Sequence, residues 1–458
     1  MNGTPALSQY LQPLRLAIQG VELLERSKNS GSLVELEEGI NILRNANGHI
    51  PTYHPIKVSC LIILGISFFR RFERLGDVTD LDEAISTQQH AVHLTPDGHP
   101  DKSRRLANLG NLFAMRTRSP PDTALLTSAN PSPRVSSMIY VFNAFNQATC
   151  ALSQSAQSHS GPPSVRFRSA RQWAYLCFSV RSSEALKAYS VVANLLPRVV
   201  WLGRTVEQRY TDISGMGDAM ADAVHTAIHF SKLNLALEWM EQGRSIVWGQ
   251  MLQLRTPLDE LHEYHPDEAT SLENISRALD SAAVSIPYHF DPLKDGASQS
   301  LADVAQAHRR LAEEYERTLV HIRDLPGFSE FLLPKQSASL CRAATSGPVI
   351  TVNAHKARCD ALIVFPHSSQ VSHVPLPALQ LSVVQDMRLQ LVGLMRQARH
   401  YCDADEELFD ILGRLWSYVV EPILCHLKVS HFTLCACFEG IDHAYSCSES
   451  LCTGRCRT

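Results

Sequence analysis

Cysteine and histidine residues near the C-terminal end have the greatest potential for chemistry. Six of the twelve cysteines lie between Cys425 and residue 458. Tetrahedral zinc takes four such ligands, and the candidates are Cys435, Cys437, Cys447, Cys452, Cys456, His431 and His443. No CxxC pair occurs and the spacing is irregular, so the favoured interpretation is an altered or frameshifted terminus without selected structure. Metal binding is the alternative, and no metal-ligating residue is assigned.

Cys359 and Asp360 raise the question of a thiol nucleophile. An activated cysteine needs a basic partner or another source of positive charge. Cys359 lies at the start of an apolar run, where its side chain is expected to be buried. The sequence therefore predicts a structural role for this cysteine.

Two other patterns resemble known motifs without completing them. His262 and His265 are three residues apart and Pro266 follows, whereas the HExxH metalloprotease helix spaces its histidines by four. Gly215 and Gly217 follow no strand, so a helix break is favoured over a dinucleotide site. P-loop, GxSxG and kinase motifs are absent from the sequence. The sequence therefore assigns no catalytic, cofactor-binding or metal-binding residue, and we expect no cofactor.

The composition bounds the function class. A net charge of −4 gives no electrostatic case for nucleic acid or an acidic membrane. No apolar run approaches the roughly 18 residues of a transmembrane helix, and the first twenty residues lack a secretory pattern. Cysteines before residue 425 are scattered, which is typical of reduced thiols. We expect a cytoplasmic protein whose oligomeric state is open.

The element that must organise the chain is an expected helix at 235–254. Its apolar residues recur at intervals of three or four, and Thr256-Pro257 ends the run. Trp239 and Trp248 are interpreted as core anchors. Arg244 and Arg255 could contact a partner, although solvated side chains are favoured.

An internal repeat precedes this helix. Thirteen residues recur identically 45 positions later. The first copies are Leu36, Glu38, Ile40, Ala46, Pro51, His54, Pro55, Lys57, Leu61, Leu64, Gly65, Phe68 and Arg71. The second copies are Leu81, Glu83, Ile85, Ala91, Pro96, His99, Pro100, Lys102, Leu106, Leu109, Gly110, Phe113 and Arg116.

The spacing within the repeat resembles the second helix of a tetratricopeptide (TPR) repeat. Small residues seven apart let helices approach closely, and a proline ends the unit. Three copies with proline are Gly39-Leu43-Ala46-Pro51, Ala84-Gln88-Ala91-Pro96 and Ala185-Tyr189-Val192-Pro197, and Ala236-Met240-Gly243 lacks it. A 45-residue period also suits HEAT or armadillo units. Either reading predicts a mainly α protein whose N-terminal solenoid binds a protein or peptide partner.

The remaining chain divides by composition and period. We assign 1–118 to TPR-like repeats, 119–169 to a Ser/Pro-rich linker or degraded repeat, and 170–257 to further repeats. A helical connector at 258–335 holds long helices at 260–282 and 301–323. From 336 to 436 we expect an α/β portion, with strands at 349–352, 361–365 and 371–375, helices at 381–399 and 408–424, and a strand at 431–436. An irregular Cys-rich tail occupies 437–458.

Six segments of the chain resemble those of CHAT-domain proteins, in which a caspase-like α/β domain is fused to TPR repeats. They are 233–261, ENISRALD (273–280), HRRLAEEYE (308–316), LPGFSEFLLPK (325–335), CDALIVFP (359–366) and HVPLP (373–377). The resemblance implies an incomplete caspase-like domain at 336–436. Active relatives carry a His and a Cys at the ends of later central strands, and no residue here matches those positions. We therefore expect a scaffold or sensor that is not an enzyme. The alternative is a CHAT-family cysteine peptidase, regulated by its repeats, with the Cys/His dyad encoded beyond residue 458.

Overall fold

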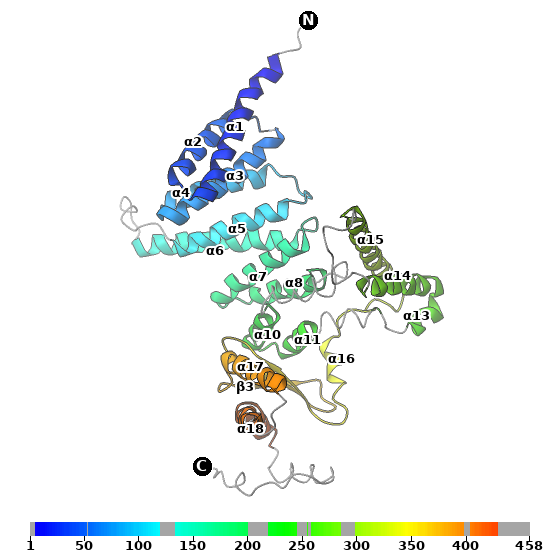
Figure 1. Cartoon of the computed structure of the whole chain (residues 1–458). Coiled ribbons are helices and arrows are strands. Elements are labelled where there is room, and N and C mark those ends of the chain that lie inside the picture. Colours follow the sequence, from blue (N-terminus) through cyan, green and yellow to red (C-terminus); the bar gives the residue numbers. More distant parts are fainter. Residues whose placement is uncertain are drawn as a thin grey trace. The chain divides into compact units, whose positions relative to one another are not determined.

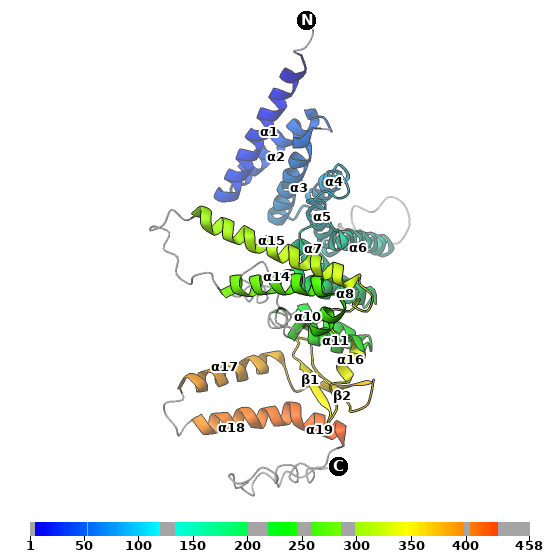
Figure 2. The same cartoon turned by 90° about the vertical axis from the view of Figure 1, so that its right-hand side faces the viewer.

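The computed structural model describes residues 5–52, 54–119, 133–199, 219–244, 254, 258–284, 298–397 and 404–428. The chain separates into two compact units. Unit 1 comprises Met1–Thr226 and Glu241–Pro334, and unit 2 comprises Ala227–Met240 and Lys335–Thr458. In the described residues, unit 1 consists of helices, whereas unit 2 combines helices with a small sheet (Figures 1 and 2). The chain is therefore mainly helical. No described helix is long and apolar enough to cross a bilayer.

Unit 1 begins with four helical hairpins, each made of an A helix and a B helix. The pairs are α1 (Pro5–Ser30) with α2 (Leu33–His49), α3 (Pro55–Leu75) with α4 (Val78–His93), α5 (Lys102–Arg118) with α6 (Pro133–Gln157), and α7 (Pro163–Ser179) with α8 (Glu184–Val199). Each A helix packs on its own B helix, and each B helix packs on the next A helix (Figure 1). This is the packing of an α-solenoid of TPR-like repeats.

The 45-residue repeat is visible in recurring hydrogen bonds between hairpins. His54 and His99 each accept a hydrogen bond at Nδ1 from the backbone N–H two residues later, at 3.3 and 3.1 Å. Lys57 and Lys102 each donate from Nζ to the carbonyl oxygen ten residues earlier, at 2.5 and 2.9 Å. His54 thus caps the start of α3, and His99 makes the equivalent bond to Asp101, the residue just before α5. The lysine satisfies a carbonyl at the end of the preceding B helix.

Close contacts at three glycines extend the repeat to a third copy. The glycines Gly20, Gly65 and Gly110 follow one another at 45-residue intervals in α1, α3 and α5. A Cβ atom added at these positions would lie 3.1, 2.8 and 2.6 Å from a side chain of the B helix, respectively Leu43, Gln88 and Leu152. Because each A helix meets its B helix at this distance, only glycine fits without displacing the partner.

Helices fill much of 119–169, the range assigned to a linker or a degraded repeat. Helix α6 runs through most of it, and α7 begins within it. Ala148, Leu152 and Ser155 on α6 are fully buried and repeat the small-large-small spacing. Gly110 and Leu152 are 42 residues apart, whereas Gly65 and Gln88 are 23 apart, so the third hairpin holds 42 − 23 = 19 additional residues. Residues 153–157, within the range assigned to a linker or degraded repeat, continue α6.

Two prolines act differently from the sequence prediction. Helix α8 was expected to break at Pro197, but it continues to Val199. The expected helix at 260–282 is instead two helices, α13 (Asp259–Tyr264) and α14 (Pro266–Val284). Pro266 is the first residue of α14, a position that tolerates the missing N–H. Helix α15 (Ser298–Arg323) agrees with its prediction and packs on α14 through a buried core that includes Leu272, Leu279, Ala312, Leu319 and Ile322.

Helices α10 (Ala219–His229) and α11 (Leu233–Arg244) follow the hairpins in sequence. Helix α11 forms the first half of the helix predicted at 235–254, and residues 245–253 lie outside the described residues. A Cβ atom on Gly243 would lie 2.7 Å from Met220 Cβ, so α10 and α11 also meet at a glycine.

Unit 2 contains a three-stranded antiparallel sheet in the order β1-β2-β3. The strands are β1 (Val349–Asn353), β2 (Cys359–Val364) and β3 (Val371–Leu376), which agree with the three predicted strands within the described residues. All six residues of β2 are buried. Helix α16 (Ser337–Cys341) precedes the sheet. The strand predicted at 431–436 lies outside the described residues.

Three consecutive helical segments follow α17 (Leu381–Gln397) in unit 2. They are α18 (Ala404–Leu415), the π-helix η2 (Trp416–Val420) and α19 (Glu421–Leu427). Pro422 has no N–H for the carbonyl of Tyr418, and the N–H of Glu421 bonds to Trp416 O, five residues back. The helix predicted at 408–424 therefore contains a π turn. Figure 2 shows α17 and α18 beside the sheet.

Helix α11 contributes most of its length to unit 2. Glu238 accepts a hydrogen bond from the backbone N–H of Ser337 at 2.7 Å, and Thr351 Oγ1 donates to Met240 Sδ at 3.7 Å. Trp239 is buried, as expected for a core anchor. A helix with the spacing of a repeat thus packs against the β1 side of the sheet.

Candidate functional site

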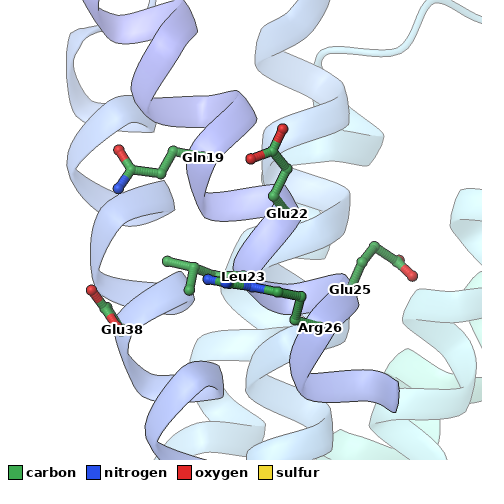
Figure 3. A pocket seen from close by; sticks show the side chains of 6 residues that line it. All are labelled: Gln19, Glu22, Leu23, Glu25, Arg26 and Glu38. Carbon is green, nitrogen blue, oxygen red and sulfur yellow. The ribbon is translucent and has the colours of Figure 1, made fainter. Parts of the chain in front are cut away.

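A surface cleft of about 640 Å³ lies between the first two helices. Figure 3 shows its lining, with one side chain from α2 and the others from α1; these are Gln19, Glu22, Leu23, Glu25, Arg26 and Glu38. We call it the α1–α2 cleft. Leu23 is buried and forms the apolar floor, whereas the other side chains are exposed. Such a cleft can receive a side chain or a short peptide segment.

The arginine in this cleft belongs to the 45-residue series. Arg26 lies 3.9 Å from Glu35, and the residues 45 positions later, Arg71 and Asp80, form a bidentate pair at 2.9 and 2.6 Å. The Arg71 side chain is 22% exposed and that of Arg26 is 66% exposed. Hydrogen bonding to Asp80 raises the pKa of Arg71. The pair is therefore a short, mostly buried salt bridge in the second hairpin and a long, exposed contact in the first hairpin.

The charge of the α1–α2 cleft favours a cationic ligand. Three carboxylates, those of Glu22, Glu25 and Glu38, line it against the single guanidinium of Arg26. Glu25 has an additional contact with Lys28, at 3.9 Å between two exposed side chains. Exposed ion pairs contribute at most about 1 kcal/mol each, so neither pair prevents exchange with the Lys or Arg side chains of a partner.

A second polar group lies on the sheet of unit 2. The buried carboxylate of Asp360 accepts at Oδ1 from Arg358 Nε at 2.7 Å and lies 2.7 Å from His373 Nε2. Its Oδ2 atom has no hydrogen-bond partner. We call this the β2–β3 polar cluster. Hydrogen bonds from a cation compensate the burial of the carboxylate, and the carboxylate in turn fixes the orientation of the His373 ring.

Cys359 does not join the β2–β3 polar cluster. Successive residues of a strand face opposite sides of the sheet, so Cys359 and Asp360 point apart. Cys359 Sγ lies in the core 3.9 Å from the carbonyl oxygen of His355, and burial raises the pKa of the thiol. Activated cysteines have lowered pKa values. The chemistry of this thiol is that of a small buried hydrophobe.

The other sequence candidates are separated or lie outside the described residues. His262 lies 3.5 Å from Glu273, whereas His265 packs edge-on against Phe328 with ring centroids 5.6 Å apart. In the described part of the chain, no cluster of three or more His, Cys, Asp or Glu residues could hold a metal ion. Gly215, Gly217, Trp248, Arg255 and every candidate zinc ligand from His431 to Cys456 lie outside the described residues, as does the side chain of Arg244.

Sequence reasoning missed both sites, although each left a signal. Extending the 45-residue offset backwards from Gly65 and Arg71 reaches Gly20 and Arg26, and so identifies α1 as a third A helix. The hairpin of β2 and β3 pairs Asp360 with Pro375, which brings His373 to the same face two residues away.

Comparisons with known proteins add little to this geometry. No protein-family model matches the chain, and no curated protein matches it. Among solved structures, the nearly identical TPR-like repeats of a putative kinesin light chain from Podosopora anserina are 13% identical to this chain, with a TM-score of 0.30, over 51% of this chain and 95% of that chain. An assembly chaperone of RpL4 is also 13% identical, with a TM-score of 0.24, over 67% of this chain and 98% of that chain. Both TM-scores are low, so the repeat assignment rests on the hairpins described above.

Proposed function

We propose that this chain is a cytoplasmic protein-interaction scaffold or sensor. Its TPR-like hairpins bind a peptide segment of another protein, and the α1–α2 cleft takes basic side chains of that segment. The observation that carries the proposal is the repeated hairpin with its recurring cap, lysine and glycine contacts. Stacked hairpins of this kind provide an extended surface for a partner, and the excess of carboxylates in the cleft selects a basic one.

A peptide array probed with the full chain tests this function. We expect binding to peptides rich in Lys and Arg that weakens with added salt. Glu22→Lys with Glu38→Lys should reduce affinity about tenfold or more, because two attractive charges become repulsive. Glu73→Lys is the control, since Glu73 is exposed on α3 and does not line the cleft. If the double variant binds the peptides as tightly as the unaltered chain, the α1–α2 cleft is not the binding site. Failure to bind any peptide contradicts the scaffold.

We further propose that 336–436 belongs to a caspase-like domain of the CHAT type, with no catalytic Cys/His pair among the residues that the structure describes. The order of the strand hairpin, α17 and α18 supports the caspase-like comparison. The buried, high-pKa state of Cys359 supports a structural role for this thiol. A thiol-reactive peptide probe should leave the purified full chain unlabelled at Cys359. Rapid labelling that Cys359→Ala abolishes would instead favour a CHAT-family cysteine peptidase.

A further inference from the structure

An exposed apolar surface runs along α18 and η2. Six large side chains are between 37% and 72% exposed, and we call them the α18 stripe; they are Leu408, Phe409, Leu412, Leu415, Trp416 and Val420. Ile411, on the opposite margin of the same helix, is 3% exposed and belongs to the core under the sheet. The helix therefore covers its core with one side, and its apolar surface continues around to solvent.

The size of the α18 stripe suits a protein interface. Aromatic side chains bury about 150–250 Å² each and the smaller Leu and Val side chains bury less, so six side chains exposed to this extent leave on the order of 500 Å² of apolar surface. Contiguous apolar patches on monomers reach about 300–600 Å² and are often functional. A stable interface takes about 800 Å² per partner, with an apolar centre and a polar rim. The stripe supplies the centre of such an interface.

The spacing of the α18 stripe suits a second helix that runs antiparallel to it. Phe409, Leu412 and Trp416 are separated by three and four residues, the spacing of a two-helix seam. A π turn holds more residues than an α turn, so Val420 follows Trp416 one turn later on the same side. With Trp416 at its middle, the seam places Leu412 opposite residue 420 of an identical antiparallel helix.

The charges at the two ends of this helix are complementary. Glu406 and Glu407 are exposed near its beginning, and Lys428 is exposed immediately after its end. An antiparallel arrangement of two identical helices brings the acidic beginning of each close to the basic end of the other. A parallel arrangement would instead place like charges together. Charge therefore favours the antiparallel pairing that the apolar spacing allows.

From these observations we propose that the α18 stripe binds the same stripe of a second copy of this chain. A twofold axis passes beside Trp416 and makes the interface isologous, so each copy contributes the same residues. The ion pair between Glu406, three residues before Phe409 on the same side of the helix, and Lys428 of the second copy sets the direction of the helices. The apolar stripe supplies most of the affinity.

Sedimentation velocity of the full chain over a wide range of concentrations tests the proposal. The unaltered chain should be a dimer whose dissociation constant rises with salt. Phe409→Glu with Leu412→Glu should weaken it at least about 100-fold, because charges would be buried without partners. Lys428→Glu should weaken it less, and adding Glu406→Lys and Glu407→Lys to that variant should restore it. Circular dichroism identifies any variant that fails to fold.

Leu389→Glu on α17 is the matched control, since Leu389 is 70% exposed and lies outside the α18 stripe. This variant should remain a dimer. Three results would overturn the proposal: a monomeric unaltered chain, a dimer that survives the double stripe variant, or equal weakening by Leu389→Glu. A monomer that gains protease sensitivity with the stripe variant would show that another segment of the same chain covers the stripe. If the chain forms the dimer but binds no peptide, the scaffold function is contradicted and the dimer proposal is not.

Discussion

Lysines 57 and 102 are the residues that join one hairpin to the next. Each lies at the start of an A helix and satisfies a carbonyl at the end of the previous B helix. Lys102 Nζ also donates to Thr95 O at 2.6 Å. An ammonium group in this position replaces water at a helix end that the next hairpin covers. Desolvation lowers the pKa of Lys57, which reflects the burial of its charge.

Replacing Lys102 with methionine should destabilise unit 1 by about 2 kcal/mol. The methionine fills similar space, but two partly buried carbonyl groups lose a charged donor. Urea unfolding followed by far-ultraviolet circular dichroism measures the change. Lys28→Met is the control, because Lys28 is exposed and makes one surface ion pair, and its effect should stay within about 0.5 kcal/mol. If the two substitutions destabilise the chain equally, Lys102 does not stabilise the junction between hairpins.

Cys177 should make the folded chain less stable in alkali. Burial is the main cause that raises the pKa of this thiol to about 11, and a free thiol titrates near 8.5. The unfolded chain therefore loses this proton first, and the contribution to stability declines as the pH rises from about 8.5 to about 11. Urea midpoints measured across this interval should fall less steeply for Cys177→Ala than for the unaltered chain. Parallel slopes would contradict the raised pKa.

At the scale of elements, the hairpins depend on close contacts at glycine. In α5, a methyl group on Gly110 would lie 2.6 Å from Leu152 Cγ and 3.2 Å from the Leu152 backbone nitrogen. The backbone of α6 cannot move without disturbing the helices on either side, since α6 packs on both α5 and α7.

Gly110→Ala should therefore destabilise unit 1 by about 1–3 kcal/mol through overpacking. Gly48→Ala in α2 is the matched control, because no atom lies within 4 Å of its added methyl group. That change should stabilise the helix by about 0.5–1 kcal/mol. Differential scanning calorimetry of the two variants gives the comparison. A Gly110→Ala variant as stable as the unaltered chain would mean that the A and B helices do not meet at this distance.

Much of the element order could be predicted from the sequence because its signals are local. Repeat spacing placed α3, α4 and α5, and alternating or continuous apolar runs placed β1, β2 and β3. Helix α6 was harder, since its buried side consists of small residues such as Ala144, Ala148 and Ser155, which give a weak apolar stripe. The β2–β3 polar cluster depends on strand register, which links Asp360 to His373 across the hairpin. Propensity carries no information about that pairing.

At the scale of the whole molecule, the order of the chain does not match its division into units. By sequence, 227–240 continue the repeats, whereas their contacts place them in unit 2. On α11, Glu238 accepts a hydrogen bond from Ser337 at the start of α16, and Met240 accepts one from Thr351 on β1. Both partners follow about a hundred positions later in the sequence. Unit 2 therefore includes a helix that precedes the connector in the sequence.

Glu238→Ala should loosen unit 2 at the beginning of α16. The Ser337 N–H would lose its carboxylate acceptor, and hydrogen bonds to charged groups contribute about 1.5–3 kcal/mol. Hydrogen exchange at Ser337 in the full chain should become faster by roughly tenfold or more. Exchange in α3, within unit 1, provides the internal control and should not change. If hydrogen exchange at Ser337 stays as slow as in the unaltered chain, the contact from α11 does not stabilise unit 2.

The third hairpin shows where this protein can accept extra chain. Its 19 additional residues separate Gly110 from Leu152 in sequence, yet the two residues meet as closely as in the shorter hairpin. The connection from an A helix to its B helix is thus free to change in length while the stack is kept. A fluorophore, affinity handle or sensor domain grafted at the equivalent connection between α3 and α4 should leave the solenoid intact, giving a direct way to label the protein inside cells.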